Sequence, residues 1–327
     1  MKYKILKLLK DKNDFISGEE IGDRFNISRS AVWKYVEKLR EEGYNIESVT
    51  KKGYLLIDSY NGFNEYEIKN CLKTEFIGKN ILFFDKIDST NDEAKRQALN
   101  EAEEGTVITC RNQTNGKGRM GRQWESETGS GLWFSVILKP AISVKNAVQI
   151  TLLGGIAALR AIRKITGAQA FIKWPNDIVI NGKKAVGILT EMSAEIESVK
   201  FVVLGIGINV NNDVFEGELA EKATSLKIET KKIYSRNLIL CEVLNEFEKL
   251  YVKYISKKSF KYFVDEYEKL CINLDRNVKV MCKDYNIEGT AVGIDENGEL
   301  IIQDYNGAVT SIYSGEVSVR NSDGKYI

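Results

Sequence analysis

Two short segments, GKGRMGRQW at residues 116–124 and KWPND at residues 173–177, decide how this chain is interpreted. The first packs three glycines, one lysine and two arginines into seven consecutive positions. Glycine lacks a Cβ, so the backbone can approach a ligand closely, while Lys117, Arg119 and Arg122 supply positive charge for a phosphate or carboxylate. The run fits neither a P-loop nor a GxGxxG motif. Taken alone, it is also typical of a solvated basic loop.

The composition is that of a soluble globular protein with two or three domains, since 327 residues exceed one typical core. Hydrophobic residues make up 43% and charged residues 28% of the chain. A net charge of +1 creates no general attraction for nucleic acid. Residues 1–56 carry a small excess of Lys and Arg over Asp and Glu, so DNA binding would depend on a local patch.

The chain contains no histidine, which excludes Ser-His-Asp and Cys-His catalysis and histidine metal sites. Its five cysteines show no CxxC spacing, and the charged start does not resemble a secretory signal. We therefore expect a cytoplasmic protein with reduced thiols and no membrane partner. The most apolar stretch, 147–162, is too short to span a bilayer and is interpreted as a buried helix. The cysteines are Cys71, Cys110, Cys241, Cys271 and Cys282.

The pattern of the first 60 residues predicts a winged helix-turn-helix domain. The expected elements are a helix over 1–10, a helix from a Ser17 cap to Phe25, a helix from a Ser28 cap to about Glu42, and a hairpin over 44–57. Trp33 is assigned to the domain core. A small helical interaction domain with a solvated surface is the alternative. The candidate DNA-binding residues lie on the second helix of the motif and at the hairpin tip: Ser28, Arg29, Ser30, Lys34, Lys38, Lys51 and Lys52.

A polar linker is expected at 58–64, followed by a domain over 65–270 and a last domain over 271–327. The middle domain mixes strand and helix patterns, which predicts an α+β fold with a mixed sheet and helices on one side. Strands are expected at 81–87, 106–111, 132–138, 171–174, 177–191 (a hairpin) and 199–209, and helices from a cap at 88–91 to about 103 and at 144–165, 235–255 and 259–270. The last domain alternates short strands with glycine turns, which predicts a small β-barrel.

Several motifs in one order resemble those of biotin–protein ligases. The loop at 116–124 resembles the family's GRGRxGR-x-W loop, with Lys117 in place of the usual arginine, and KWPND resembles its second signature. The N-terminal segment resembles the winged helix-turn-helix of the bifunctional members, which are ligases and biotin-operon repressors. The resemblance covers nearly the whole chain and implies an SH3-like final domain. The other matching motifs are STN at 89–91, Gln113, NGKKAVGIL at 181–189 and GIGIN at 205–209.

The resemblance implies that the chain activates biotin with ATP and Mg²⁺ to biotinyl-5′-AMP. Biotin would then pass to one lysine of a biotin carboxyl carrier protein, and the liganded protein would repress biotin genes by binding operator DNA. The chemistry suits a protein without histidine, because a carboxylate is already ionised at pH 7 and needs no general base. Basic side chains, backbone N–H groups and Mg²⁺ would stabilise the developing charge.

For biotin, the resemblance assigns the ureido head to the residues at the strand-to-helix junction and to Gln113. Helix capping is the structural alternative for the junction residues. Lys117, Gly118 and Arg119 would close over the carboxylate and phosphate, and Lys184 would contact the acyl-phosphate oxygens as the second catalytic residue beside Arg119. An isolated hairpin lysine is more often solvated. The full biotin set is Ser89, Thr90, Asn91, Gln113, Lys117, Gly118, Arg119, Lys184 and Gly187.

For the adenylate, the resemblance assigns Trp124 to stacking on the adenine ring. Asp177 is the candidate Mg²⁺ ligand, with a simple Pro-Asn-Asp turn as the alternative. Val214 and Phe215 lie in an expected mobile loop at 211–222 and would cover the ligand. The full set is Arg119, Arg122, Trp124, Lys173, Asn176, Asp177, Asn209, Val214 and Phe215.

Two other functions are compatible with parts of the chain. A biotin-sensing repressor without ligase activity is one, although the presence of Lys184, Arg119 and KWPND argues against it. A lipoate ligase is the other, but the glycine-rich loop and the N-terminal wing argue against it. The loop is expected to be disordered when empty, and its ordering on biotinyl-AMP would promote a homodimer, with the carrier protein competing for the liganded monomer.

Overall fold

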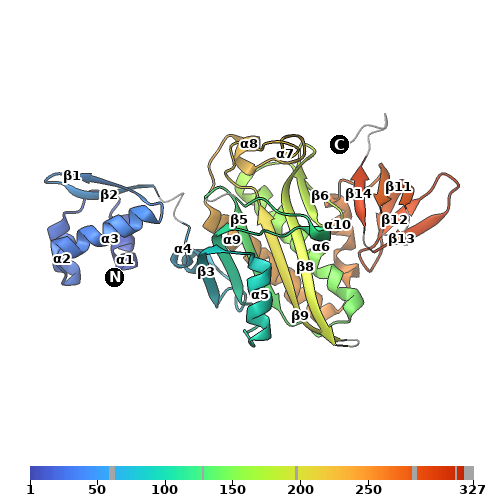
Figure 1. Ribbon diagram of the computed structural model, residues 1–327, viewed down its shortest axis with the longest axis horizontal. Coiled ribbons are helices and arrows are strands. Elements are labelled where there is room, and N and C mark those ends of the chain that lie inside the picture. Colours follow the sequence, from blue (N-terminus) through green and yellow to red (C-terminus); the bar gives the residue numbers. More distant parts are fainter. Residues whose placement is uncertain (59–62, 127–128, 196–197, 282–285, 314, 320–327) are drawn as a thin grey trace.

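The computed structural model describes residues 1–58, 63–126, 129–195, 198–281, 286–313 and 315–319. They form three bodies in a row (Figure 1). A small helical body with a hairpin lies at the N-terminal end, a large sheet with helices fills the middle, and a smaller all-β body follows. The predicted α+β architecture is therefore confirmed.

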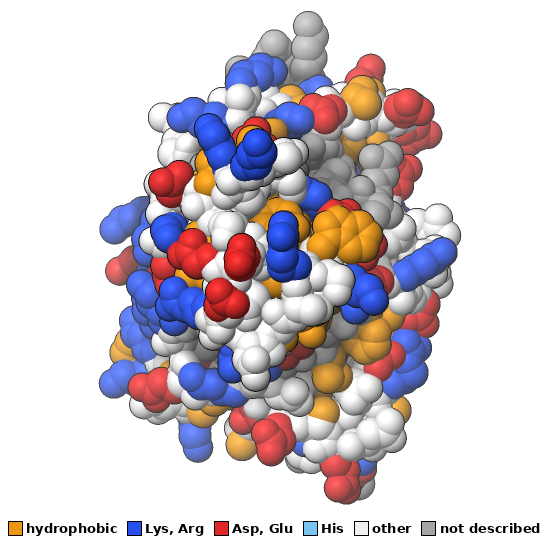
Figure 2. Space-filling model, turned by 90° about the vertical axis from the view of Figure 1, so that its left-hand side faces the viewer, with side chains coloured by type: hydrophobic (Ala, Val, Ile, Leu, Met, Phe, Trp, Pro, Cys, Tyr) orange, Lys and Arg blue, Asp and Glu red, His pale blue; other side chains and the backbone are white. Residues whose placement is uncertain are grey.

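The N-terminal body has its own hydrophobic core, separate from that of the large sheet. Both predicted caps form, because Ser17 accepts a hydrogen bond from Glu20 N at 3.0 Å and Ser28 accepts one from Ala31 N at 3.2 Å. The assignment of Trp33 to the core is wrong, since the residue is 54% exposed. Figure 2 faces this end of the molecule and shows hydrophobic side chains exposed among side chains of both charges. The elements are α1 (Lys2–Lys12), α2 (Gly18–Phe25), α3 (Arg29–Glu41), β1 (Asn45–Val49) and β2 (Gly53–Asp58).

The central body is built on a mixed sheet in the order β3-β4-β5-β9-β8-β7-β6. β3 and β4 pair in parallel, and the other neighbours pair antiparallel. β5 is buried along its whole length, as expected for a strand covered on both faces. The strands are β3 (Ile81–Ile87), β4 (Val107–Gln113), β5 (Leu132–Leu138), β6 (Ala170–Lys173), β7 (Asp177–Ile180), β8 (Lys183–Glu195) and β9 (Ser198–Ile208).

Two long helices, α6 (Ala147–Thr166) and α9 (Arg236–Lys257), pack together and cover one face of this sheet, as predicted. The opposite face carries α5 (Thr90–Leu99), which buries a smaller apolar cluster and which the one-sided prediction missed. α5 ends before the predicted Glu103, because Glu101 takes a left-handed conformation with φ of 63°. The shorter helices are η1 (Arg119–Gly121), η2 (Val144–Asn146), α7 (Leu219–Lys222), α8 (Leu226–Thr230), η3 (Phe260–Phe263) and α10 (Val264–Leu270).

The segment that joins the first two bodies differs from the predicted linker. Residues 59–62 lie outside the described part, but Phe63 and Asn64 are buried, and a short helix, α4 (Glu65–Cys71), follows at once. Asn64 caps α4 by accepting a hydrogen bond from Glu67 N at 3.1 Å, and it donates to the Tyr44 hydroxyl at 2.9 Å. The predicted linker DSYNGFN therefore ends in the central body, because Phe63, its last apolar residue, packs in the main hydrophobic core.

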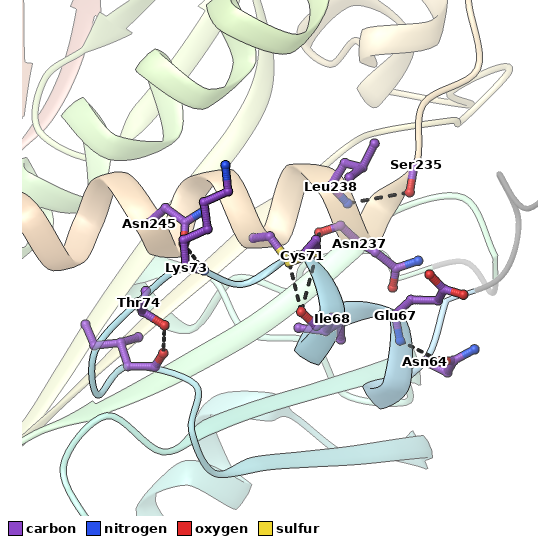
Figure 3. Close-up of a disulfide and its surroundings, with 12 residues drawn as sticks. Asn64, Glu67, Ile68, Cys71, Lys73, Thr74, Ser235, Asn237, Leu238 and Asn245 are labelled. Atoms are coloured by element: carbon purple, nitrogen blue, oxygen red, sulfur yellow. Dashed lines mark hydrogen bonds between the residues drawn. A yellow bond between two sulfur atoms is a disulfide. The ribbon is translucent and has the colours of Figure 1, made fainter. Parts of the chain in front are cut away.

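A disulfide between Cys71 and Cys241 joins α4 to α9 (Figure 3). The prediction that these thiols are reduced is therefore wrong. The two cysteines are 170 residues apart in sequence and meet only because α4 packs on α9, so their spacing carried no sign of the pairing. Cys110 and Cys271 are free and buried, and burial raises the pKa of their thiols to about 12 and about 11. Cys282 lies outside the described residues.

The C-terminal body is a five-stranded antiparallel sheet in the order β13-β12-β11-β10-β14. Its described end strands do not pair with each other, so the sheet is open where a closed SH3-like barrel was expected. It contacts the central body through the Trp174 indole N–H, which donates to Gly298 O at 3.0 Å. The strands are β10 (Asn277–Met281), β11 (Asn286–Ile294), β12 (Leu300–Gln303), β13 (Val309–Ile312) and β14 (Glu316–Val319). Within the described ranges, every helix lacks the length or apolar character that a bilayer crossing requires.

Candidate active site

Two adjoining cavities lie beside the glycine-rich loop and share Gly118, Arg119, Trp124, Asn176 and Lys184. The residues predicted to bind biotin all line the first cavity: Ser89, Thr90, Asn91, Gln113, Lys117, Gly118, Arg119, Lys184 and Gly187. Most residues predicted to bind the adenylate line the second: Arg119, Arg122, Trp124, Lys173, Asn176, Asp177, Asn209 and Phe215. Val214 does not line the second cavity, because its side chain points outward and is 66% exposed.

A chain of neutral polar groups forms one wall of the first cavity. Ser135, buried in β5, donates from Oγ to Asn91 Oδ1 at 2.6 Å, and the same Oγ lies 2.8 Å from the Thr90 hydroxyl. Thr90 N donates to Gln113 Oε1 at 2.8 Å, and Gln113 Nε2 donates to the Ser126 hydroxyl at 3.0 Å. Each group is thus held in place by its neighbour. Such a wall suits an uncharged ligand group that has both N–H donors and a carbonyl acceptor.

Ser89 precedes α5 at the N-cap position, but its side chain makes no capping hydrogen bond. Simple helix capping therefore does not account for this hydroxyl. The neighbouring Asp88 accepts a hydrogen bond from Ser89 N at 2.7 Å, and hydrogen bonds from Arg96 hold the pKa of its carboxyl at about 2. The negative charge of Asp88 at the start of α5 interacts favourably with the helix dipole. The Ser89 hydroxyl, which makes no capping bond, is therefore available at the cavity wall.

The glycine-rich loop folds back on itself as a narrow hairpin. Gly118 N donates to Arg122 O at 2.7 Å, and Trp124 N donates to Gly116 O at 2.9 Å. A Cβ on Gly116 would come within 2.4 Å of Trp124 O, so this position requires glycine. The disorder of the empty loop and its ordering by a ligand stay predictions.

Ion pairs tie this loop to α5, and α5 to β8. The Lys117 ammonium lies 2.7 Å from Asp92, and Lys95 lies 2.8 Å from both Asp92 and Glu191. Burial alone would raise the pKa of Asp92, but the hydrogen bonds from Lys117 and Lys95 outweigh it and hold that pKa below its usual range. Because Asp92 stays ionised, Lys117 remains anchored at the cavity mouth at neutral pH.

Arg119 lies where the two cavities meet. Its Nη1 donates to Asn176 Oδ1 at 2.8 Å and to Gly315 O at 3.3 Å. The guanidinium therefore links the glycine-rich loop to KWPND and to the C-terminal body. A cation at this boundary can contact both a carboxylate in the first cavity and a phosphate in the second.

Lys184, on β8, also lies at the boundary of the two cavities. Its ammonium is 2.7 Å from Asp177 and 5.2 Å from the centre of the Trp124 ring. The indole lies directly on two glycines: a Cβ on Gly187 would approach it to 2.5 Å, and one on Gly207 to 2.9 Å. Lys184 is therefore not a solvated hairpin lysine but part of the cavity wall.

In the described part of the chain, no three His, Cys, Asp or Glu side chains converge as a set of metal ligands. Mg²⁺ commonly binds one or two carboxylates together with substrate phosphates. Asp177, on the wall of the second cavity, fits such a role. The residues are therefore compatible with a Mg²⁺ that arrives with a nucleotide.

The structure adds residues that the prediction did not name as site residues. Gly205 forms the floor under Asn91, since a Cβ there would lie 1.9 Å from Asn91 Oδ1. The alternating glycines of GIGIN were a visible sign of such close approach. Ser135 was detectable as the single polar residue of the strand LWFSVIL. The sequence did not indicate Glu191 or Asp92, because their ion pairs form only where α5 packs against β8 and the glycine-rich loop.

The candidate DNA-binding residues are all exposed on the N-terminal body. Ser28, besides its cap, lies 2.9 Å from the Ser30 hydroxyl. Those of α3 are exposed on its outward side, and those of the hairpin lie at the exposed tip between β1 and β2. The exposed residues are Ser28, Arg29, Ser30, Lys34, Lys38, Lys51 and Lys52.

Comparisons with known proteins agree with this arrangement. Residues 83–209 match the Biotin/lipoate A/B protein ligase family, residues 2–55 an HTH domain, and residues 274–320 the Biotin protein ligase C terminal domain. A biotin protein ligase from Aquifex aeolicus in complex with biotin and ATP superposes with a TM-score of 0.65 at 34% identity, covering 75% of this chain and 100% of that one. The fold and the site thus define a ligase of the biotin/lipoate type that carries a helix-turn-helix domain.

The sequence relatives narrow this class. The bifunctional ligase/repressor BirA of Bacillus subtilis (strain 168) is 42% identical over 310 residues, 94% of each chain. The protein of the same name from Escherichia coli (strain K12) is 27% identical over 320 residues, 98% of this chain and 97% of that one. This chain belongs to the family of bifunctional biotin protein ligases and repressors.

Proposed function

We propose that this protein activates biotin with ATP, transfers it to one lysine of a biotin carboxyl carrier protein, and represses biotin genes in its liganded state. The observation that carries the proposal is the pair of adjoining cavities. One is walled by neutral hydrogen-bonding groups, the other by cationic and aromatic groups, and Arg119 and Lys184 belong to both. This arrangement suits two ligands that react at the boundary.

In the first half-reaction, a biotin carboxylate oxygen attacks the α-phosphorus of ATP, and the bond to pyrophosphate breaks. The ureido head binds Ser89, Thr90, Asn91 and Gln113, which positions the carboxylate at the boundary of the cavities. Arg119 and Lys184 offset the charge of the two reacting anions, and Trp124 stacks on adenine. Mg²⁺ bound to the phosphates would supply further charge neutralisation, with Asp177 as its protein ligand.

In the second half-reaction, a lysine amine of the carrier attacks the acyl carbon of biotinyl-5′-AMP, an amide forms, and AMP leaves. Lys184 stabilises the negative charge that passes to the phosphate oxygens as the acyl–oxygen bond breaks. Asp177 keeps this ammonium in place between turnovers. Arg122, Lys173, Asn209 and Phe215 line the remaining wall of the nucleotide cavity, and Val214 would cover it after a movement of its loop.

The repressor activity uses the N-terminal body, whose exposed cations would bind the phosphates of operator DNA. One winged helix makes few base contacts, so tight binding requires a homodimer on a palindromic site. Biotinyl-AMP would promote this dimer by stabilising the 116–124 hairpin, and the carrier protein would compete for the liganded monomer. A protein with these partners works in the cytoplasm.

The decisive experiment incubates the purified protein with labelled biotin, ATP, Mg²⁺ and a carrier domain. We expect label on the carrier in an ATP-dependent manner. If biotin binds but no label transfers, the protein is a biotin-sensing repressor without ligase activity. If lipoate is transferred instead of biotin, it is a lipoate ligase.

A separate measurement tests the regulation. Sedimentation with and without biotin plus ATP should show a dimer only in the liganded sample, with tighter operator binding under the same conditions. An oligomeric state and an operator affinity that stay constant would rule out the switch.

A further inference from the structure

Trp33 on α3 is a large aromatic side chain that is exposed, although nothing in the fold requires its exposure. It is 54% exposed, whereas Val32, Val36 and Leu39 on the same helix are fully buried. Burying an indole contributes several kcal/mol to binding or folding, so large aromatic side chains usually have a partner. Nothing in the N-terminal core uses this one. Its partner must therefore approach from outside.

The surface around the indole indicates the chemistry of that partner. Arg29, Ser30 and Lys34 flank Trp33 on the same side of the helix, and all three are exposed. The acidic residue one turn further on, Glu37, is paired with Arg40 at 2.6 Å, so a cation offsets its charge. An aromatic group surrounded by cations fits a polyanion that also has apolar features. Duplex DNA has both.

We propose that Trp33 reads the operator, with its indole packed against the C5-methyl group of a thymine in the major groove. This rests on the proposed repressor function. In a helix-turn-helix, the N-terminal residues of the second helix face the base edges, and Trp33 is the fifth residue of α3. The thymine methyl is the apolar feature of that groove. Lys34 and the hairpin lysines contact phosphates, which position the protein without reading sequence.

The test needs an operator probe, which is obtained by selecting duplexes from a random pool with the full-length protein, biotin, ATP and Mg²⁺. Each thymine of the selected site is then replaced, one at a time, by deoxyuridine, which lacks the methyl group and keeps the same pairing. Wild-type protein should lose about fourfold in affinity at one symmetric pair of positions per methyl removed, the factor expected for one methyl-sized group.

Trp33→Ala should bind the selected duplex at least about tenfold more weakly and should no longer distinguish thymine from uracil at that position. Its affinity for an unselected duplex should stay unchanged, whereas Lys34→Ala should weaken both. Ile57→Ala is the matched control, since Ile57 is 51% exposed in the same domain and lies outside the helix. Biotin transfer should be unaffected in every variant, and the unchanged affinity of Trp33→Ala for the unselected duplex shows that its N-terminal body, which has a separate core, is still folded.

Three outcomes separate the possibilities. If Trp33→Ala binds the selected duplex within twofold of wild type, the assignment is wrong. If the variant still loses affinity on uracil substitution, the indole contacts the sugar-phosphate backbone and not the methyl group, which also overturns the proposal. If the wild-type protein selects no sequence at all, the DNA-binding function itself fails, whatever Trp33 does.

Discussion

At the scale of single residues, Lys184 offers the sharpest test of the proposed chemistry. Lys184→Ala should nearly abolish biotin transfer, because a charge-assisted contact made chiefly in the transition state contributes about 2–4 kcal/mol. Lys183→Ala is a matched control: the neighbouring lysine points to Ala220 O at 2.8 Å and does not line either cavity. Single-turnover transfer rates measure the effect. Transfer by Lys184→Ala within a few-fold of wild type would contradict the assignment.

The absence of histidine leads to a prediction about pH. The residues that line the two cavities include no histidine, cysteine or tyrosine, so none of their side chain types ordinarily changes charge between about pH 6 and about pH 8. The pKa of Asp92 is depressed, so its contact with Lys117 is complete at neutral pH and is lost only as pH falls through a value below the usual range. Biotin affinity measured by calorimetry should therefore vary less than about twofold across this interval. A clear inflection near neutral pH would show that another group in the site titrates.

At the scale of elements, the 116–124 hairpin should control how long the adenylate stays bound. Arg119→Gly removes the link to Asn176 and to Gly315 and adds a fourth glycine to the loop. Dissociation of biotinyl-AMP should accelerate about tenfold or more, as expected for loss of a charge-assisted bond, while its formation falls less. Free biotinyl-AMP would then label exposed lysines of an added bystander protein. Unchanged adenylate dissociation would argue against this role.

The disulfide between α4 and α9 predicts a redox-dependent stability. Closing a loop of 170 residues restricts the unfolded chain and stabilises the fold by about 5 kcal/mol in the chain-entropy model. A reductant should lower the thermal unfolding midpoint of the wild-type protein but not that of the Cys71→Ser/Cys241→Ser variant. The variant without reductant is the control, and it should unfold near the reduced wild type. Equal midpoints with and without reductant in the wild type would show that the bond does not form.

The elements themselves were largely predictable, because local patterns set them. Ser17 and Ser28 capped the expected helices, and the strand LWFSVIL appeared at its predicted bounds. What could not be predicted depends on contacts between distant segments. Trp33 was assigned to the core because large aromatic residues are usually buried, although its position on the helix exposes it. Phe63 was assigned to the linker because the residues around it in sequence are polar. In the site, motif order located both cavities, but the Asp92 and Glu191 ion pairs required the packing of α5 against β8.

At the scale of the whole molecule, the N-terminal body should be separable from the ligase. Its core is distinct, and none of the residues that line the two cavities lies upstream of position 89. Deleting residues 1–60 should therefore abolish operator binding and leave adenylate synthesis detectable. The cut retains Phe63, Asn64 and α4, which belong to the central body, and it removes the Lys10 and Tyr44 partners of Glu67.

The readouts for this truncation are pyrophosphate release and binding to operator DNA. Circular dichroism serves as the control for folding. A soluble and folded truncation that makes no adenylate would show that the two bodies are not independent.

The Cys71–Cys241 bond also changes the topology of the polypeptide. It closes a covalent ring that contains every predicted biotin and adenylate residue, from Ser89 to Phe215. The DNA-binding body and the C-terminal sheet lie outside this ring, as an N-terminal and a C-terminal tail. A protease cut in the exposed stretch around Asp213 and Glu216 would therefore leave a single molecule made of two fragments. In denaturant, those fragments would separate only when a reductant also breaks the disulfide, so gels run with and without reductant would distinguish the cut ring from a cut in either tail.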